Sequence, residues 1–177
     1  MTLPLNTHAD LSKRIQDHQC TVDELSAWAG ESAENDRLIA AHNNVGSETL
    51  KKLSRSKDEK TRELVASNSN APVAVLMDLA DDFPRAFLLN PVFDLIFFED
   101  PGVLGHLYES TLAIILSQKE CPQPIVDWAY KFYKRKNSYS SKVLMGVVKN
   151  PYTPVKTIKA ILKMDFANGV TCEEGFL

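Results

Sequence analysis

Histidine and cysteine side chains in the N-terminal region of this sequence could ligate a zinc ion. His18 and Cys20 lie two positions apart, and His8 and His42 belong to the same N-terminal region. A tetrahedral zinc site needs three or four ligands at recognisable spacings, which this group does not show. The pair is more simply interpreted as incidental, with His42 serving as a corner residue between helices. We therefore predict a protein without a metal or another cofactor.

Groups for other kinds of catalysis form no motif in the sequence. The seven glycines occur singly, so the sequence contains no glycine-rich phosphate loop. Cys121 or His106 could serve an unrecognised hydrolase, because such sites leave no spacing rule, but nothing beyond the residue types favours this. The adjacent Asp81 and Asp82 are more typical of a solvated helix end than of acid–base catalysis. We predict a non-enzymatic protein.

The elements that must position any binding residue follow a degenerate repeat. The segments Asn68 to Pro72 and Asn150 to Pro154 each begin with asparagine and reach proline four residues later. Eight and eleven positions after the asparagine the sequence carries leucine or isoleucine, which is the spacing of one helical face. These residues are Leu76, Leu79, Ile158 and Ile161, and the same offsets from His42 give Leu50 and Leu53. The positions at which the copies begin, which we call anchors, lie near residues 17, 42, 68, 90, 120 and 150.

The chemistry of these anchors predicts two short helices joined by a corner. The asparagine can end a helix in a left-handed conformation or accept a hydrogen bond within its own turn. A proline suits the start of the next helix, Thr153 suits an N-cap, and Thr21 with Glu24 forms a predicted capping box. Short helices must stack to bury their apolar faces. We predict an all-α helical solenoid of short helix pairs, in one domain over residues 1–177.

The best copies resemble the leucine-rich repeat variant family. The resemblance rests on the segments Leu64 to Pro72, with Leu76 and Leu79, and Val147 to Pro154, with Ile158 and Ile161. The resemblance covers about half of the chain. It implies a right-handed, armadillo-like solenoid in which α and 3-10 helices alternate in a curved stack, and it implies a bacterial protein. Some family members carry an iron–sulfur site on an N-terminal cysteine cluster. This sequence has a single cysteine there, so that cofactor is not carried over.

Charge is distributed unevenly along the chain. Residues 1–118 contain 10 basic and 18 acidic side chains, whereas residues 119–177 contain 10 basic and 5 acidic ones. An acidic region beside exposed aromatic residues would attract a basic protein partner, although the same acids could serve solubility alone. The acidic residues that we predict to bind a partner are Asp78, Asp81, Asp82, Asp94, Glu99, Asp100 and Glu109.

A cationic and aromatic segment runs from Trp128 to Lys136. Aromatic rings interleaved with cations can stack nucleic-acid bases and hold phosphates. However, the spacing places Trp128 and Phe132 on one packed helical face, which leaves Tyr130 and Tyr133 for binding. The net charge of −3 and the pI of about 5.8 count against nucleic acid as the main partner. Nucleic-acid binding through this basic, aromatic C-terminal third is therefore the alternative.

The apolar run over residues 86–98 is interrupted by Asn90, Pro91 and Asp94, and it is shorter than the roughly 20 residues of a membrane-spanning helix. We expect it to be core. The N-terminus shows no secretory signal, and the three cysteines have no paired spacing, so we expect a cytoplasmic protein with free thiols.

Together these features predict a protein–protein interaction module. A small acidic binder without a visible active site is what an immunity protein or antitoxin that neutralises a basic toxin enzyme would look like. As a hypothesis, the acidic residues between 78 and 109 occupy the substrate groove of that enzyme.

Overall fold

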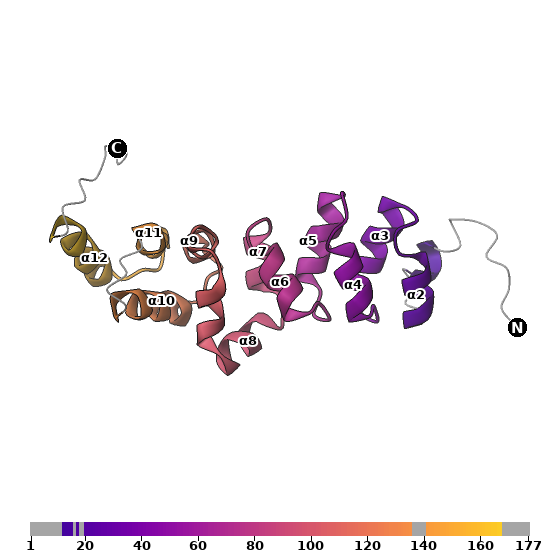
Figure 1. The fold of residues 1–177 in the computed structure, drawn as a ribbon, viewed down its shortest axis with the longest axis horizontal. Helices are drawn as coiled ribbons and strands as arrows, with labels where there is room; N and C mark the ends of the chain where they lie inside the picture. The colour runs from indigo at the N-terminus through magenta and orange to yellow at the C-terminus, as the bar shows by residue number, and fades with distance from the viewer. Residues whose placement is uncertain (1–11, 16, 18–19, 136–140, 168–177) are drawn as a thin grey trace, which may run out of the picture. The chain divides into compact units, whose positions relative to one another are not determined.

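The computed structural model describes residues 12–15, 17, 20–135 and 141–167, and these residues form helices and turns without a β-strand (Figure 1). The all-α prediction is confirmed for this part of the chain. The chain divides into two compact units, an N-terminal unit of Met1–Ile96 and a C-terminal unit of Phe97–Leu177. One domain over the whole chain stays a prediction.

Short helices in two rows build the N-terminal unit. One row contains α3, α5 and α7, in which α3 contacts α5 and α5 contacts α7, and α2, α4 and α6 lie in the other row (Figure 1). The boundary between the units falls within α8. The elements are α2 (Val22–Trp28), α3 (Ala33–Ala40), α4 (Ser47–Leu53), α5 (Glu59–Ser67), α6 (Val73–Leu79), α7 (Pro84–Leu89) and α8 (Phe93–Glu99).

Polar side chains fix the starts of several of these helices. Thr21 and Glu24 form the predicted capping box of α2, which satisfies two backbone N–H groups that have no partner within the helix. Ser32 caps α3 by accepting from the N–H of Asn35. The local sequence therefore determines where these helices begin.

The leucines that follow the anchors form the core of the N-terminal unit, as their spacing predicted. Leu50 and Leu76 are fully buried, and Leu53 and Leu79 are nearly so. In the C-terminal unit the pattern holds less well, since Ile161 is buried but Ile158 is half-exposed.

Buried asparagines join consecutive corners. The Nδ2 amide of Asn68 donates to the carbonyl oxygens of Ala40 and His42, at 2.8 and 3.1 Å. Its Oδ1 atom accepts from the backbone N–H of Asn70 at 2.8 Å. Asn68 has extended backbone angles (φ −83°, ψ 128°), so it hydrogen-bonds within its own turn instead of adopting the left-handed conformation. Carbonyl groups left over at the end of α3 thus gain a donor.

The same arrangement recurs at the other anchors. Nδ2 of Asn90 donates to Ala66 and Asn68, and its Oδ1 atom accepts from the N–H of Val92. At position 42, Nδ1 of His42 accepts from the N–H of Asn44 at 3.0 Å, so this histidine stands in a corner as the sequence predicted. In the C-terminal unit, Asn150 donates to Leu116 and Gln118 and accepts from Tyr152.

One predicted cap is wrong. Thr153 does not begin the last helix, because its hydroxyl donates to the carbonyl oxygen of Val147 at 2.5 Å. This hydrogen bond satisfies a carbonyl near the end of the preceding helix, so Thr153 closes one helix and does not open the next.

The C-terminal unit packs its remaining helices around α11. Helix α11 contacts α9, α10 and α12, and it approaches α9 most closely. A Cβ atom added at Gly146 would lie 2.6 Å from the carbonyl oxygen of Ala113, so only glycine allows this approach. The elements are η1 (Pro101–His106), α9 (Glu109–Ser117), α10 (Gln123–Arg135), α11 (Ser141–Lys149) and α12 (Val155–Ala167).

Candidate partner-binding site

The seven acidic residues proposed from the sequence are all exposed, and they divide between the two units. Asp78, Asp81, Asp82 and Asp94 belong to the N-terminal unit, whereas Glu99, Asp100 and Glu109 belong to the C-terminal unit. Several of them also interact within the fold. Asp82 lies 3.9 Å from the guanidinium of Arg62, and Asp100 caps η1 by accepting from the N–H of Gly102. Their exposure leaves them accessible to a partner.

Helix α8 carries acidic and apolar side chains on the same outward face. Asp94 and Phe98 are four residues apart, and Leu95 and Glu99 follow each of them directly, so the four share one side of the helix. Phe98 is 84% exposed and Leu95 is 55% exposed. The opposite side packs inward through Phe93 and Ile96. We call these four residues the α8 face.

The α8 face corrects the expectation that the apolar run over residues 86–98 is core. Phe87 and Phe93 are buried and stack edge to face with ring centroids 4.9 Å apart. Leu89, Leu95 and Phe98 instead point to solvent. The helical spacing of Asp94 and Phe98 was the signal that could have revealed the second group, because a charged residue marks the side of a helix that faces water.

A second exposed aromatic ring lies at the start of α9. Tyr108 is 84% exposed, and the exposed Glu109 follows it directly. Exposed phenylalanine and tyrosine rings with a neighbouring carboxylate therefore occur twice in a short stretch of the C-terminal unit. Glu109 was predicted from the sequence to bind a partner, whereas Tyr108 was not.

The aromatic residues of α10 form a packed cluster. Phe97 meets Trp128 edge to face at 6.2 Å between ring centroids, Trp128 stacks on Phe132 at 5.1 Å, and Phe132 contacts Tyr133 at 5.3 Å. This cluster fixes the end of α8 against α10. The expectation that Trp128 and Phe132 serve packing is confirmed.

Tyr133 is buried, so its selection as a partner-binding residue is wrong. Burial raises the pKa of its hydroxyl, and the negative charge of Glu109 raises it further. Tyr130 is half-exposed and lies beneath the ammonium of Lys134, 5.6 Å from the ring centroid. Of the two tyrosines, Tyr130 alone remains accessible.

The described cysteines are held as thiols. Cys20 and Cys121 are buried, and burial raises the pKa of Cys121 to about 12. A thiolate is the reactive form of cysteine, so this environment disfavours nucleophilic attack by Cys121 at neutral pH.

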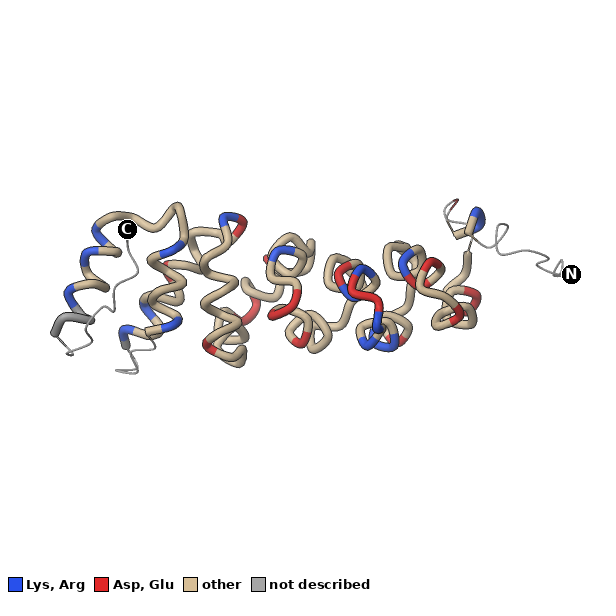
Figure 2. The backbone as a smooth tube through the Cα atoms, turned by 90° about the horizontal axis from the view of Figure 1, so that it is seen from above, with Lys and Arg blue, Asp and Glu red and all other residues tan. Residues whose placement is uncertain are grey.

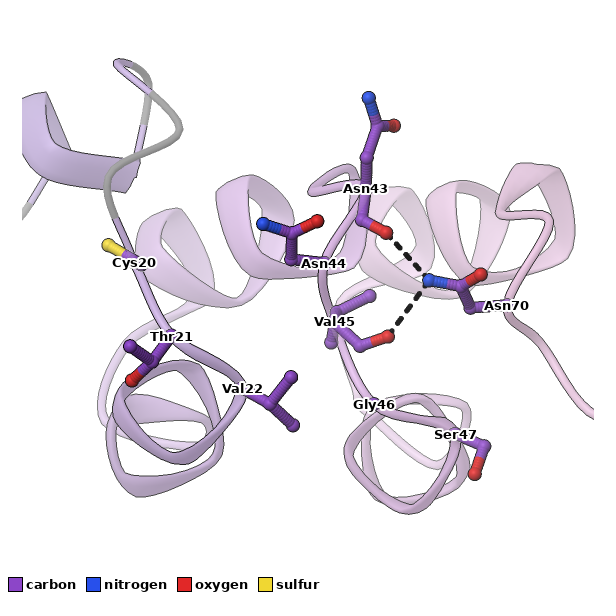
Figure 3. A pocket seen from close by; sticks show the side chains of 9 residues that line it. All are labelled: Cys20, Thr21, Val22, Asn43, Asn44, Val45, Gly46, Ser47 and Asn70. Carbon is purple, nitrogen blue, oxygen red and sulfur yellow. Dashed lines mark hydrogen bonds between the residues drawn. The ribbon is translucent and has the colours of Figure 1, made fainter.

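An open hollow of about 700 Å³ lies beside the first corners of the N-terminal unit (Figure 3). The amide of Asn70 crosses it to the carbonyl oxygens of Asn43 and Val45, at 2.7 and 3.1 Å. Cys20 is its one titratable group among the described residues, and burial raises the pKa of that thiol. The hollow is therefore lined by neutral groups, namely Cys20, Thr21, Val22, Asn43, Asn44, Val45, Gly46, Ser47 and Asn70.

The described residues contain no group of three or more His, Cys, Asp or Glu side chains that could hold a metal ion. His8 and His18, two of the histidines considered in the sequence, lie outside the described residues. No helix in the described part of the chain has the length and apolar character needed to cross a membrane.

Comparison of the chain with models of protein families, with curated proteins and with solved structures gave no match.

Proposed function

We propose that this protein is a non-enzymatic binding module that recognises a basic protein through exposed aromatic and acidic residues. The observation that carries the proposal is the pairing of Phe98 with Glu99 and of Tyr108 with Glu109, in which each ring is 84% exposed. A folded chain gains by burying such rings, and aromatic residues are enriched at the centres of protein interfaces. Rings left in water beside carboxylates are suited to burial against a partner.

The acids define the chemical class of the partner. Asp94 and Glu99 flank Leu95 and Phe98 on the α8 face, so an apolar contact there would have a negative rim. A rim of one charge accelerates encounter with a surface of opposite charge and disfavours partners of the same charge. Asp78, Asp81 and Asp82 add negative charge to the N-terminal unit. The partner therefore presents lysine or arginine around an apolar pocket.

The scaffold that we propose is a stack of short helix pairs, as in the leucine-rich repeat variant family that the sequence resembles. The same hydrogen bonds at Asn68, Asn90 and Asn150 support equivalent corners. The right-handed, armadillo-like solenoid and the bacterial origin belong to this proposal. A basic toxin enzyme that is neutralised by this protein, as by an immunity protein or antitoxin, fits both the charge and the exposed rings.

Charge reversal tests the proposed partner class. Asp78, Asp94 and Glu99 are exposed and form no described ion pair, so the variant D78K/D94K/E99K changes the surface without removing a structural contact. We expect the tagged variant to lose the protein that the wild type captures from its native cell after nuclease treatment. The control D23K/E31K/E59K changes the net charge equally at other exposed acids and should retain that protein.

Equal capture by the wild type and both variants would refute an acidic binding surface. Capture of nucleic acid alone, lost on nuclease treatment, would refute a protein partner.

A further inference from the structure

The basic residues of the two units have different surroundings. Ion pairs in the N-terminal unit join basic side chains to carboxylates, and these basic residues are Arg14, Arg37, Lys51, Lys60 and Arg62. The described lysines of the C-terminal unit form no such pair. Within the described fold, no carboxylate therefore neutralises these lysines.

The last two helices concentrate this unpaired charge. Residues 141–163 contain five lysines and no acidic residue, and all five lysines are exposed. Lys156, Lys159 and Lys163 lie at the i, i+3 and i+7 positions of α12, which places them on one side of the helix. Figure 2 shows this row as blue segments that recur along α12. At 1.5 Å per residue the row extends over about 10 Å.

Two of these lysines lie where they do not stabilise their helices. Lys142 and Lys156 are the second residues of α11 and α12, and neither helix has an acidic residue in its first turn. A helix N-terminus carries a partial positive charge, so a cation there is unfavourable for the isolated helix. In contrast, α2, α3, α4 and α5 each have an acid in the first turn. The arrangement adds to the positive potential at α12, which suits an anion.

An exposed aromatic ring precedes the lysine row in the chain. Tyr152 lies in the corner before α12 and is 65% exposed, and its backbone N–H is fixed by Oδ1 of Asn150. A ring anchored at its backbone and open to solvent offers a stacking surface for a base. A row of cations over about 10 Å matches a polymer with regularly spaced charges better than it matches a single small anion.

We propose that the α12 lysine row and Tyr152 form a second binding site, for a single-stranded nucleic acid, with the lysines on its phosphates and Tyr152 under a base. The site is separate from the acidic and aromatic residues of the proposed protein interface. It differs from the site expected from the sequence, because Tyr133 is buried and Lys136 and Tyr139 lie outside the described residues.

Fluorescence anisotropy with a labelled single-stranded DNA of mixed sequence tests the proposal, with a salt series from about 50 to 200 mM. We expect K156E/K159E/K163E to weaken binding on the order of tenfold or more, and to make the slope of log K against log salt less negative by about 2. The control K13E/R55E/K57E makes the same charge change at exposed residues of the N-terminal unit and should bind within about twofold of the wild type.

The Tyr152→Ala variant tests the stacking contact. We expect this variant to bind the single strand with roughly tenfold lower affinity than the wild type. Its affinity for a duplex of the same sequence should be unchanged. No binding at the lowest salt, or equal losses in the two triple variants, would overturn the site. Equal affinity of Tyr152→Ala and wild type for the single strand would overturn the assignment to single strands. Circular dichroism melting checks that each variant is folded.

Discussion

Individual buried amides determine how the corners of this protein are joined. Asn68 is 8% exposed, its amide donates to carbonyl oxygens of the preceding corner, and its Oδ1 atom accepts from a backbone N–H of its own corner. A buried polar group that loses its partner costs about 1–3 kcal/mol, so each such amide has a large effect for its size. Asparagine is suited to this position because it combines two donor hydrogens with an acceptor on a short side chain.

We expect Asn68→Ala to lower the free energy of unfolding by about 2 kcal/mol, because it leaves two buried carbonyl oxygens without their amide donor. Asn68→Asp should cost more, since it places a carboxylate against the carbonyl oxygens of Ala40 and His42. Urea titration of each full-length variant measures its free energy of unfolding. The exposed Asn44→Ala is the control and should stay within about 0.5 kcal/mol of the wild type. If Asn68→Ala matched that control, the corner hydrogen bonds would contribute little.

The roles of some individual residues could be predicted from the sequence, and those of others could not. The capping box at Thr21 and the core leucines follow from local spacing, and both are confirmed. The exposure of Phe98 and the burial of Tyr133 were not predicted, because each depends on which side of a helix the neighbouring helices cover. Hydrophobic character alone does not distinguish core from interface, since both are apolar.

At the scale of elements, close helix approach and helix capping hold the units together. Helices α9 and α11 meet at Gly146, where the absence of a Cβ atom brings two backbones into contact. The sequence showed Gly146 as an isolated glycine, and its role emerges only from the partner helix. In the N-terminal unit, Asp58 caps α5 and also binds Arg37, so one carboxylate ties α3 to α5.

Gly146→Ala should destabilise the protein by about 1–3 kcal/mol, because the added methyl group forces α9 and α11 apart. This overpacking exceeds the gain of about 1 kcal/mol that alanine normally brings to a helix interior. Gly105→Ala is the matched control, since its Cβ atom would lie at an ordinary 3.4 Å from the ring of Phe132. Thermal unfolding compares the two, and a higher melting temperature for Gly146→Ala would contradict the close approach.

The pairing of Asp58 predicts a stability that depends on pH. Hydrogen bonds from Arg37, and then from Thr61, hold the pKa of the Asp58 carboxyl well below its usual range. A carboxyl whose pKa is lower in the folded than in the unfolded protein stabilises the fold at pH values above its unfolded pKa, which is about 3.9 for aspartate. This stabilisation is lost as the pH falls from the unfolded pKa through the folded pKa.

We therefore expect Asp58→Asn to lower the melting temperature at pH 7, and the difference from wild type to shrink progressively below about pH 4. Arg37→Gln should reproduce most of the effect, because Arg37 is the largest cause of the shift. A difference between wild type and Asp58→Asn that stays constant from pH 7 down to about pH 2 would contradict the assignment.

For the whole molecule, charge is segregated between the units. Residues 1–96 contain 10 basic and 15 acidic residues, whereas residues 97–177 contain 10 basic and 8 acidic ones. The ion pairs of the N-terminal unit neutralise several of its cations, while the lysines of α12 remain unpaired among the described residues. This segregation was visible in the sequence, and the structure adds which charges are already engaged within the fold.

The most direct test of the central claim is capture of the partner by the wild type and by a variant without the exposed rings, F98S/Y108S. Each tagged protein is exposed to nuclease-treated extract of the native cell, and stoichiometric partners are identified by mass spectrometry. The control L89S/Y152S removes two other exposed apolar side chains, which are 59% and 65% exposed.

We predict that the wild type and the control capture the same basic protein, and that F98S/Y108S loses it while keeping the wild-type melting temperature. Undiminished capture by F98S/Y108S would contradict the claim that these rings form the protein-binding site.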